Sequence, residues 1–341
     1  MDKKIRFAIV GCGHIGKRHA EMICRNEESE LVALIDTNEN LKVELKEKYN
    51  TPFFNSLTDF ISANIPADVI CIATPNGLHA SHALYAIETG HHVVVEKPMA
   101  LTKVDCEGMI YKALHYSKHI FSVKQNRYSP PSEWLKRLVI ENVLGDIYMV
   151  NINCFWNRDE RYYKTGAWHG TKKLDGGTLF TQFSHFIDLM YWVFGDIADI
   201  KATFSNYSHT GLIEFEDTGS VIFKFINGGD GCLNFSTSVW DRNFESSMTV
   251  IGQNGTLKIG GQYMDKVEYC NIKDYTMPEL NSTNPPNDYG PYQGSASNHH
   301  YVIENVVDVL KGRATISTNA LEGLKVVDII ERIYSHKKIG N

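Results

Sequence analysis

Three glycines near the N-terminus, Gly11, Gly13 and Gly16, have the spacing of a turn that binds a pyrophosphate. In such a turn the first glycine lets the chain bend tightly, the second lets the main chain approach the phosphates, and the third lets helix and strand pack closely. The amides at the start of the following helix, around His14 and Ile15, face the phosphates, where the helix dipole favours negative charge. The spacing predicts a dinucleotide site.

An acidic residue follows the next apolar run, residues 31–35. This residue, Asp36, stands twenty positions after Gly16. An acidic side chain there accepts hydrogen bonds from a ribose diol and repels a 2′-phosphate, and the next residue, Thr37, supplies no cation. The pattern favours NAD over NADP as cofactor. The alternative is an ordinary glycine-rich turn followed by a surface aspartate.

Oxidation of an alcohol needs a base for the hydroxyl proton while hydride leaves for a nicotinamide. Lys97 follows the apolar run 92–95 within Glu96–Lys97–Pro98, at the edge of the predicted sheet where ligands bind. An ammonium at this place can polarise a hydroxyl or stabilise an alkoxide, and burial can lower a lysine pKa enough for proton transfer. The alternative is a surface lysine in a turn.

The second candidate for this chemistry is His185, in the apolar segment 178–194, which has helical spacing. Thr181, His185 and Asp188 stand at i, i+4 and i+7, so we expect them on one helix face. Asp188 would then fix the tautomer and orientation of the imidazole. The alternative is a histidine whose hydrogen bonds are satisfied by a carboxylate at a helix–sheet interface.

Arginines and aromatic residues lie close together in and before a loop at 157–171. Guanidinium groups bind phosphate and carboxylate through paired hydrogen bonds, and aromatic planes stack on sugars or bases. A ligand with both features would suit the group; the alternative is a solvated basic loop whose aromatics are in the core. The residues are Arg127, Arg158, Arg161, Trp156, Tyr162, Tyr163 and Trp168.

Alternating strands and helices over residues 1–124 position the first candidates. The run 68–73 is almost entirely apolar, as expected of a parallel strand covered on both faces. It ends in Thr74–Pro75–Asn76, followed by a helix that begins at His79. The pattern predicts an NAD-binding Rossmann domain, a doubly wound parallel sheet, over 1–124.

Residues 125–341 have a different pattern, which predicts an α+β domain for substrate binding and oligomerisation. A large, mostly antiparallel sheet is backed by the helix 178–194, and the last two helices, 298–311 and 319–334, can pack back on the first domain. A loop at 270–297 lacks periodicity, which is typical of a functional or subunit contact. The expected strands are 144–156, 198–205, 211–215, 219–225, 231–238, 246–251 and 256–259.

Composition and net charge indicate which partners, metals and cellular location to expect for the protein. The chain of 341 residues carries a net charge of −6, which argues against nucleic acid as a partner. The seven cysteines form no C-x-x-C pair, and His91–His92 and His299–His300 lack metal-ligand spacing, so we expect no metal and place these histidines in turns or on the surface. Without a signal pattern or an apolar run of about 20 residues, we expect a cytoplasmic protein away from membranes.

Together these motifs resemble the Gfo/Idh/MocA family of oxidoreductases over essentially the whole chain. The resemblance rests on the glycine turn, Glu96–Lys97–Pro98, and Gly176–Gly177 followed by His185-x-x-Asp188. More particular segments resemble the UDP-N-acetyl-glucosaminuronate 3-dehydrogenases of the WlbA type from bacterial O-antigen synthesis. These segments are VKQNR at 123–127, IYMVN at 147–151, Phe155–Trp156, Tyr162–Tyr163, WHGT at 168–171 and DGG at 175–177.

The resemblance implies an NAD-dependent dehydrogenase that oxidises the 3-hydroxyl of a UDP-linked N-acetylated sugar in lipopolysaccharide biosynthesis. It implies that Lys97 and His185 flank the reacting carbon, His185 as the base and Lys97 as an electrostatic partner. Cofactor contacts are expected at Gly11, Gly13, His14, Ile15, Gly16, Asp36, Thr74, Pro75, Asn76, His79, Glu96, Lys97, Gln125 and Trp168. Substrate contacts are expected at Lys97, Arg127, Arg158, Tyr163, Thr181, Gln182 and His185.

Two positions depart from the patterns. Thr181 stands where inositol dehydrogenases of the family carry an aspartate, which weakens an inositol interpretation. His169 stands where the WlbA-like pattern has arginine, which removes one cationic contact. The family's C-terminal sheet commonly forms homodimers or homotetramers, so an oligomer is expected. An inositol or free-sugar dehydrogenase of the same family and a non-catalytic NAD-binding sensor remain alternatives.

Overall fold

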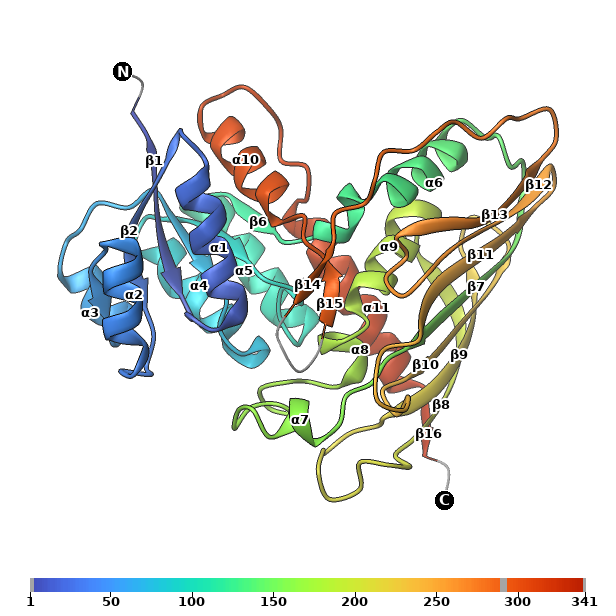
Figure 1. Cartoon of the computed structure of the whole chain (residues 1–341), viewed down its shortest axis with the longest axis horizontal. Coiled ribbons are helices and arrows are strands. Elements are labelled where there is room, and N and C mark those ends of the chain that lie inside the picture. The colour runs from blue at the N-terminus through green and yellow to red at the C-terminus, as the bar shows by residue number, and fades with distance from the viewer. Residues whose placement is uncertain (1–2, 289–292, 340–341) are drawn as a thin grey trace. The chain divides into compact units, whose positions relative to one another are not determined.

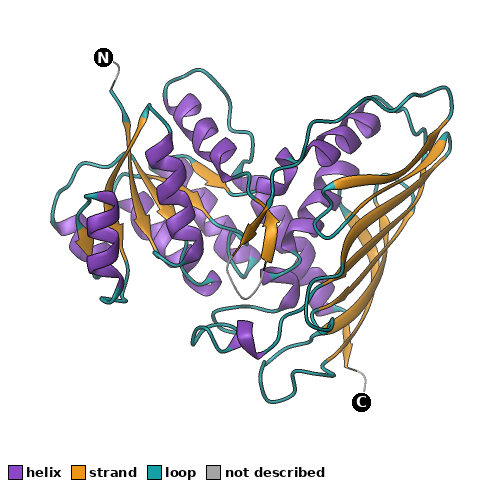
Figure 2. Cartoon of the chain, viewed as in Figure 1, coloured by secondary structure: helices purple, strands orange, loops and turns teal. Residues whose placement is uncertain are grey.

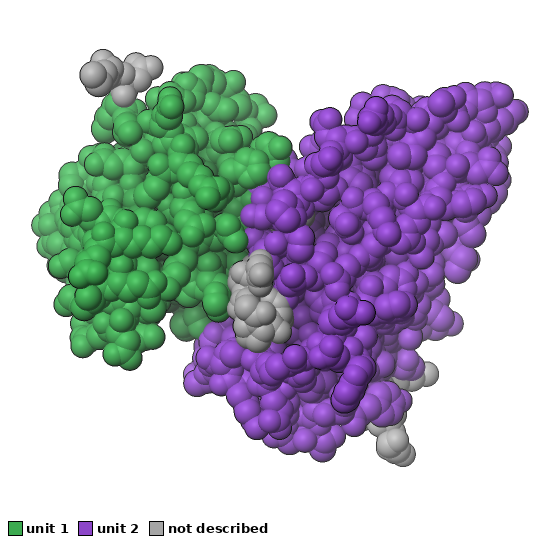
Figure 3. Space-filling model, viewed as in Figure 1, with its two compact units in different colours: residues 1–124, 299–327 green, residues 125–298, 328–341 purple. Residues whose placement is uncertain are grey.

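A computed structural model of the chain describes residues 3–288 and 293–339, which divide into two compact units (Figure 3). Within these ranges, unit 1 contains residues up to 124 together with 299–327, and unit 2 contains 125–298 and 328 onward. Helix α10 (His299–Leu310) therefore belongs to unit 1, and helix α11 (Ala320–Ser335) is divided between the units.

In the described part of unit 1, six parallel strands form a sheet in the order β3-β2-β1-β4-β5-β6. Figure 1 labels β1, β2 and β6 of this sheet, and Figure 2 shows the helices of the same unit around it. Successive strand residues point to opposite faces, and all of Val69–Ile72 are buried, so both faces of the sheet are covered. The predicted Rossmann sheet is confirmed. Its strands are β1 (Ile5–Val10), β2 (Ser29–Ile35), β3 (Phe53–Phe54), β4 (Val69–Ile72), β5 (His92–Val95) and β6 (Ile120–Ser122).

The helices of unit 1 follow the strands closely in sequence. Helix α1 begins at His14, directly after Gly13, because that glycine is its extended N-cap residue. The strand order reverses between β1 and β4, the place where doubly wound sheets bind ligands. The other helices between these strands are α2 (Leu41–Tyr49), α3 (Leu57–Ser62), η1 (Asn76–Leu78), α4 (His79–Glu88) and α5 (Lys103–His115).

The described residues of unit 2 form an eight-stranded, mostly antiparallel sheet in the order β13-β12-β11-β7-β10-β9-β8-β16 (Figure 1). Buried and exposed residues alternate along its strands, so one face is buried and the other is open. Its strands are β7 (Ile147–Phe155), β8 (Ile197–Ser205), β9 (Thr218–Phe225), β10 (Asp230–Ser236), β11 (Glu245–Gly252), β12 (Gly255–Gly260), β13 (Lys266–Ile272) and β16 (Lys337–Ile339).

Aromatic rings join the helices of unit 2 to the buried face of its sheet. Phe183 contacts Phe235 of β10 with ring centroids 5.7 Å apart, and Phe194 contacts Phe225 of β9 at 5.4 Å. The predicted α+β architecture with a large antiparallel sheet is therefore confirmed. The remaining elements are η2 (Gln125–Tyr128), α6 (Pro130–Ile140), α7 (Glu160–Tyr163), α8 (Thr178–Thr181), α9 (Ser184–Phe194), β14 (Pro286–Asp288) and β15 (Gln293–Ala296).

Two predicted elements of unit 2 are wrong. The helix expected over 178–194 is broken between α8 and α9, because Phe183 leaves the helical path to place its ring in the core. The strand expected over 211–215 is a series of turns. Ile213 and Phe215 alternate because they pack on Tyr162 and Tyr163, with no neighbouring strand.

Other elements were not expected from the sequence. Helix α6 starts with Pro130 and Pro131, which suggest a break but are compatible with a first helical turn, where no amide partner is needed. The loop expected over 270–297 contains the end of β13 and the pair β14–β15; its residues 289–292 lie outside the described ranges. Among the described residues, no helix combines the length and apolar character needed to span a bilayer.

Candidate functional site

The glycine turn at residues 11–16 has the geometry that a bound pyrophosphate requires. Gly11 has a φ of +90°, and a Cβ there would lie 2.5 Å from the carbonyl oxygen of Ala73. A Cβ on Gly16 would overlap the carbonyl oxygen of Gly11, whereas a Cβ on Gly13 would meet no atom within 4 Å. The turn is therefore closed behind Gly11 and Gly16 and open at Gly13, so it fits a dinucleotide.

Asp36 lies directly against this turn. One carboxylate oxygen accepts a hydrogen bond from the amide of Cys12 at 2.6 Å, and the other accepts from the amide of Asn38 at 2.8 Å. Burial raises the pKa of the Cys12 thiol to about 12, so the thiol stays neutral beside the carboxylate. The negative charge next to the turn is therefore that of Asp36. His14 and Ile15 begin helix α1 at the same place, His14 being exposed.

The turns that follow β4 and β5 are tied together by a histidine. His79 is buried, and its ring nitrogens lie 2.8 Å from the carbonyl oxygen of Thr74 and 2.7 Å from that of Pro98. Asn76, which lies in η1 next to Pro75, is also buried. The structure thus brings the predicted residues Thr74, Pro75, Asn76 and His79 to the carboxyl end of the sheet. His79 connects them to the segment that carries Lys97.

Glu96 is buried and has partners that the sequence did not indicate. Its Oε1 lies 2.8 Å from Nε2 of His19, and its Oε2 accepts a hydrogen bond from the amide of Lys97 at 3.2 Å. Nε2 of His299 lies 3.4 Å from the same oxygen, Oε1. The expectation that His299 lies in a turn or on the surface is wrong, because it is buried within helix α10.

The sequence contained a signal that His19 and His299 are buried. His19 is three residues after Gly16 and four before Ile23, so it shares the buried face of α1. His299 precedes Val302 and Ile303 at helical spacing on the buried face of α10. A helical projection of each segment would have placed the imidazoles inside, although it could not have paired them.

In unit 2, residues of η2 lie against residues of α9. Nε2 of Gln125 and Nε2 of His185 are 3.5 Å apart, and both side chains are buried. Arg127 donates two hydrogen bonds to the carboxylate of Asp188, at 2.8 and 2.7 Å. The structure therefore pairs Asp188 with an arginine that the sequence analysis assigned to the substrate. Such a bidentate pair fixes η2 to α9.

A second set of predicted residues surrounds Arg158, which is also buried. Its guanidinium donates to Oε1 of Gln182 at 2.7 Å and to Oδ1 of Asn243 at 3.0 Å, and it lies over the ring of Trp156 with a distance of 4.8 Å to the centroid. Gln182 in turn donates to the hydroxyl of Tyr162 at 2.8 Å. Arg161 differs, since it is exposed and paired with Asp159.

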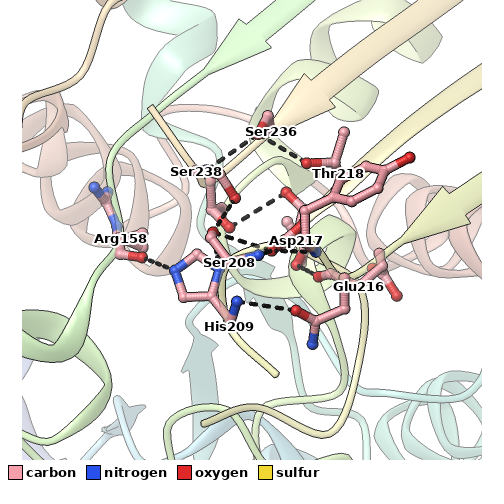
Figure 4. A network of polar contacts seen from close by, with 12 residues as sticks. Arg158, Ser208, His209, Glu216, Asp217, Thr218, Ser236 and Ser238 are labelled. Atoms are coloured by element: carbon pink, nitrogen blue, oxygen red, sulfur yellow. Dashed lines mark hydrogen bonds and ion pairs between the residues drawn. The ribbon is translucent and has the colours of Figure 1, made fainter. Parts of the chain in front are cut away.

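A polar network holds the main chain of Arg158 (Figure 4). His209 lies between the Arg158 carbonyl oxygen and the carboxylate of Asp217, with a nitrogen 3.0 Å from the carboxylate. The same Asp217 oxygen accepts from the amide of Ser208 and lies 3.2 Å from the Ser208 hydroxyl, which is also 2.6 Å from the hydroxyl of Ser238. Burial opposes ionisation of Asp217, but these donors hold its pKa well below the ordinary 3.8.

The remaining predicted residues of unit 2 lie beside these two sets. Tyr163 is buried in a cluster with Tyr162, Ile213 and Phe215, and burial raises its pKa above the ordinary value of 10.0. Thr181, at the end of α8, donates its hydroxyl proton to the carboxylate of Asp175, and the same hydroxyl lies 3.0 Å from the Asp175 main-chain oxygen. Because the helix breaks after Thr181, the expectation that Thr181, His185 and Asp188 share one continuous helix face is wrong.

The aromatic segment with Trp168 is half-buried. The indole of Trp168 lies against the ring of His169 with centroids 4.0 Å apart, and His169 lies against Tyr162 at 4.4 Å. His169 stands where an arginine was expected from the resemblance. Its imidazole therefore continues a row of rings from Trp168 to the tyrosine that contacts Gln182.

Comparisons with known proteins agree with this architecture in both halves of the chain. Residues 5–124 match the model of an oxidoreductase family with an NAD-binding Rossmann fold, GFO_IDH_MocA. Residues 133–258 match the GFO/IDH/MocA C-terminal domain. Among curated relatives, the D-glucoside 3-dehydrogenase of Escherichia coli is 29% identical over 56% of this chain and 54% of its own length.

Two solved structures align with almost the whole chain. The WlbA dehydrogenase of Bordetella pertussis, in complex with NADH and UDP-GlcNAcA, is 31% identical, with a TM-score of 0.88 over 98% of this chain and 96% of its own. The WlbA dehydrogenase of Chromobacterium violaceum, also with NADH and UDP-GlcNAcA, is 32% identical, with a TM-score of 0.88 over 98% and 94%.

The two family matches, the similarity to WlbA dehydrogenases and a glycine turn that fits a dinucleotide lead to one conclusion. The expected family, fold class and cofactor are confirmed. The chain is an NAD-dependent oxidoreductase and belongs to the Gfo/Idh/MocA family.

Proposed function

We propose that this enzyme oxidises the 3-hydroxyl of a UDP-linked N-acetylated sugar of the UDP-GlcNAcA type, in surface polysaccharide biosynthesis. The observation that carries the proposal is the similarity over almost the full chain to two dehydrogenases whose structures contain NADH and UDP-GlcNAcA. A relative that is a D-glucoside 3-dehydrogenase supports oxidation at the same sugar carbon.

His185 and Lys97 are the catalytic residues of this proposal. His185 takes the proton of the sugar hydroxyl, and the Lys97 ammonium stabilises the oxygen as its negative charge develops. When bound, NAD would accept a hydride from the sugar carbon that bears this hydroxyl, so the products would be a ketone, NADH and one proton. The amide of Gln125, which lies 3.5 Å from the His185 ring nitrogen, supports this role because it can orient the imidazole.

Arg158 and its partners are proposed to recognise the charged part of the substrate, together with Arg127, Tyr163, Thr181 and Gln182. A buried guanidinium between Trp156 and Tyr162 suits a diphosphate or a uronate carboxylate, with aromatic surface for the base or sugar. Trp168 is proposed to lie near the cofactor.

Turnover of defined substrates tests this function. NADH formation is measured with UDP-GlcNAcA, UDP-GlcNAc, inositol and glucose, beside a thermal-shift series of the same ligands with NAD present. We expect turnover with UDP-GlcNAcA, and a loss of kcat of about 100-fold or more in Lys97→Ala and His185→Ala. Turnover of only inositol or glucose would favour a free-sugar dehydrogenase, and NAD binding without turnover of any of them would favour a sensor.

We further propose a cytoplasmic homodimer or homotetramer that interacts with neither nucleic acid nor membrane. Exposed apolar side chains on the open face of the unit 2 sheet support association between copies of the chain: Met149, Ile222, Ile251 and Tyr269 are each at least 40% exposed. Light scattering of the purified protein tests this, and a monomer at micromolar concentration would contradict it.

A further inference from the structure

Three buried side chains from separate segments of unit 1 meet at one carboxylate oxygen. Oε1 of Glu96, which follows β5, lies 2.8 Å from Nε2 of His19 in α1 and 3.4 Å from Nε2 of His299 in α10. The two imidazoles meet edge to face, with centroids 5.5 Å apart. We call these three residues the Glu96 cluster. The side chains of its members are at most 7% exposed, so water does not screen their charges.

The charges within the Glu96 cluster are balanced by one proton. Burial opposes ionisation of Glu96, but the two imidazoles hold its pKa well below the ordinary 4.5. Burial also opposes protonation of His19, but its neighbours Cys71 and Glu96 raise its pKa to about 10. Burial lowers the pKa of His299, so this ring stays neutral. The result is a buried imidazolium–carboxylate pair beside a neutral imidazole.

The second oxygen of Glu96 connects the cluster to the proposed catalytic lysine. Oε2 accepts a hydrogen bond from the main-chain amide of Lys97 at 3.2 Å. His19 is on the helix whose first turn belongs to the glycine turn, one helical turn after Gly16. A single carboxylate therefore spans the cofactor-binding helix α1, helix α10 and the main chain of Lys97.

A metal ion is the other occupant that two histidines and a glutamate suggest, since their ligand atoms lie within 4.8 Å of one another. The distances favour a proton instead. Ligand atoms around tetrahedral zinc are about 3.3 Å apart, given metal–ligand bonds of about 2.0 Å. His19 and Glu96 are closer, at 2.8 Å, which is a charge-assisted hydrogen bond.

We propose that His19 and His299 are positioning residues, which hold the Glu96 carboxylate so that it fixes the main chain of Lys97 relative to helix α1. The inference rests on the proposed function only for the catalytic role of Lys97. His19 does so by donating a hydrogen bond to Oε1, and His299 does so by packing against the same oxygen, so that the carboxylate keeps one orientation.

The test compares His19→Ala, His299→Ala and His19→Gln with the control His92→Gln. Gln can place an N–H near the position of Nε2, and His92 is on β5, the strand that leads to Glu96, at its opposite end. Four quantities are measured: hydrogen exchange of the Lys97 amide by mass spectrometry, NAD affinity, kcat with UDP-GlcNAcA, and bound metal. The exchange rate needs no substrate, so it tests the positioning even where the enzyme proves inactive on UDP-sugars.

We expect the Lys97 amide to exchange at least about tenfold faster in both alanine variants and at the wild-type rate in His92→Gln. We expect kcat to fall about 10- to 100-fold in the alanine variants, with NAD affinity within about threefold of wild type, and to recover in His19→Gln. Unchanged Lys97 exchange in folded His19→Ala would overturn the proposal. So would a stoichiometric metal ion that the wild type holds and His19→Ala loses. No turnover of UDP-sugars by wild type, with faster exchange in the variants, would overturn only the proposed function.

Discussion

The glycine turn of unit 1 and the surroundings of Arg158 in unit 2 hold their polar groups in different ways. At the turn, main-chain atoms face open space at Gly13, and one carboxylate, Asp36, lies against the turn. Around Arg158, the guanidinium donates hydrogen bonds to side chains from several segments, among them Gln182 and Asn243. A main-chain site needs a few glycines in order, whereas a side-chain site needs partners distant in the sequence.

This difference predicts how each region fails. Adding a methyl group damages the main-chain site, because at Gly11 and Gly16 atoms already fill the space where the Cβ would go, and at Gly13 the Cβ would enter the open space assigned to the phosphates. Removing one partner damages a buried side-chain site, because a buried cation then lacks a hydrogen-bond acceptor, as at Arg158, or its counter-charge, as at Arg127. The four predictions below test this contrast, from the largest expected effect to the smallest.

The largest effect is expected for Gly16→Ala. Its Cβ would overlap the Gly11 carbonyl oxygen, so the free energy of unfolding should fall by about 4 kcal/mol or more and NAD binding should be lost. Gly13→Ala is the matched control, since its Cβ is in open space. It should unfold within about 0.5 kcal/mol of wild type and still lose at least about tenfold in NAD affinity. Urea unfolding measures the stability of the two variants, and calorimetric titration measures their affinity for NAD. Normal NAD binding by Gly13→Ala would contradict the assignment of the open space at Gly13 to phosphates.

The next effect is expected at the buried pair Arg127–Asp188. Asp188→Asn leaves the guanidinium without its counter-charge and should lower the free energy of unfolding by about 3–5 kcal/mol. The double variant Arg127→Met with Asp188→Leu removes both charges and should recover most of that loss. Urea unfolding of all three proteins measures this. A loss below 1 kcal/mol, roughly the size of an exposed pair, would show that burial of this pair is energetically unimportant.

A smaller effect concerns the choice of cofactor at Asp36. Asp36→Ser removes the carboxylate that accepts ribose hydrogen bonds and repels a 2′-phosphate. We expect kcat/KM with NAD to fall about 10- to 100-fold and that with NADP to rise. Steady-state rates with the two cofactors give the ratio of kcat/KM with NAD to kcat/KM with NADP. The role assigned to Asp36 would be untenable were the ratio to stay at its wild-type value.

The smallest effect is a pH dependence that comes from His19. Its pKa is about 10 in the folded chain against an ordinary 6.5, so between these values the native state binds a proton that the unfolded chain lacks. The stabilisation is complete below pH 6.5 and is lost as the pH rises through 10, by up to about 1.4 kcal/mol per pH unit. Over the single unit from pH 7 to pH 8, where the loss is at most about 1.4 kcal/mol, melting temperatures should therefore fall more steeply in wild type than in His19→Gln. An equal fall of the melting temperature with pH in the two proteins would rule out a contribution of His19 to the pH dependence of stability.

Local pattern predicted the parallel sheet of unit 1 well. Runs such as Val69–Ile72 are apolar at every position because both faces of the sheet are covered, and the glycine spacing depends on residues only a few positions apart. The same method failed at 211–215, where an alternating pattern arises from packing of Ile213 and Phe215 on two tyrosines. Periodicity reports which residues are buried, and it does not report what they are buried against.

The candidate site shows the same division. Asp36 could be placed against the glycine turn because its position follows from its distance along the chain from that turn. The partners of Asp188 and Glu96 could not: Arg127 is 61 positions from Asp188, and His19 is 77 positions from Glu96. His19 and His299 carried a local signal of burial, but no local signal could join them through one carboxylate.

The amino-acid sequence alone determined the family resemblance, the choice of NAD and the residue types available for catalysis, since these depend on short motifs and on side-chain chemistry. The tertiary structure alone decided which charged side chains form pairs. It paired Arg127 with Asp188 and joined His19, Glu96 and His299. Electrostatic interactions act through space and are strongest where water is excluded, so the fold, and not the order of residues, sets their partners.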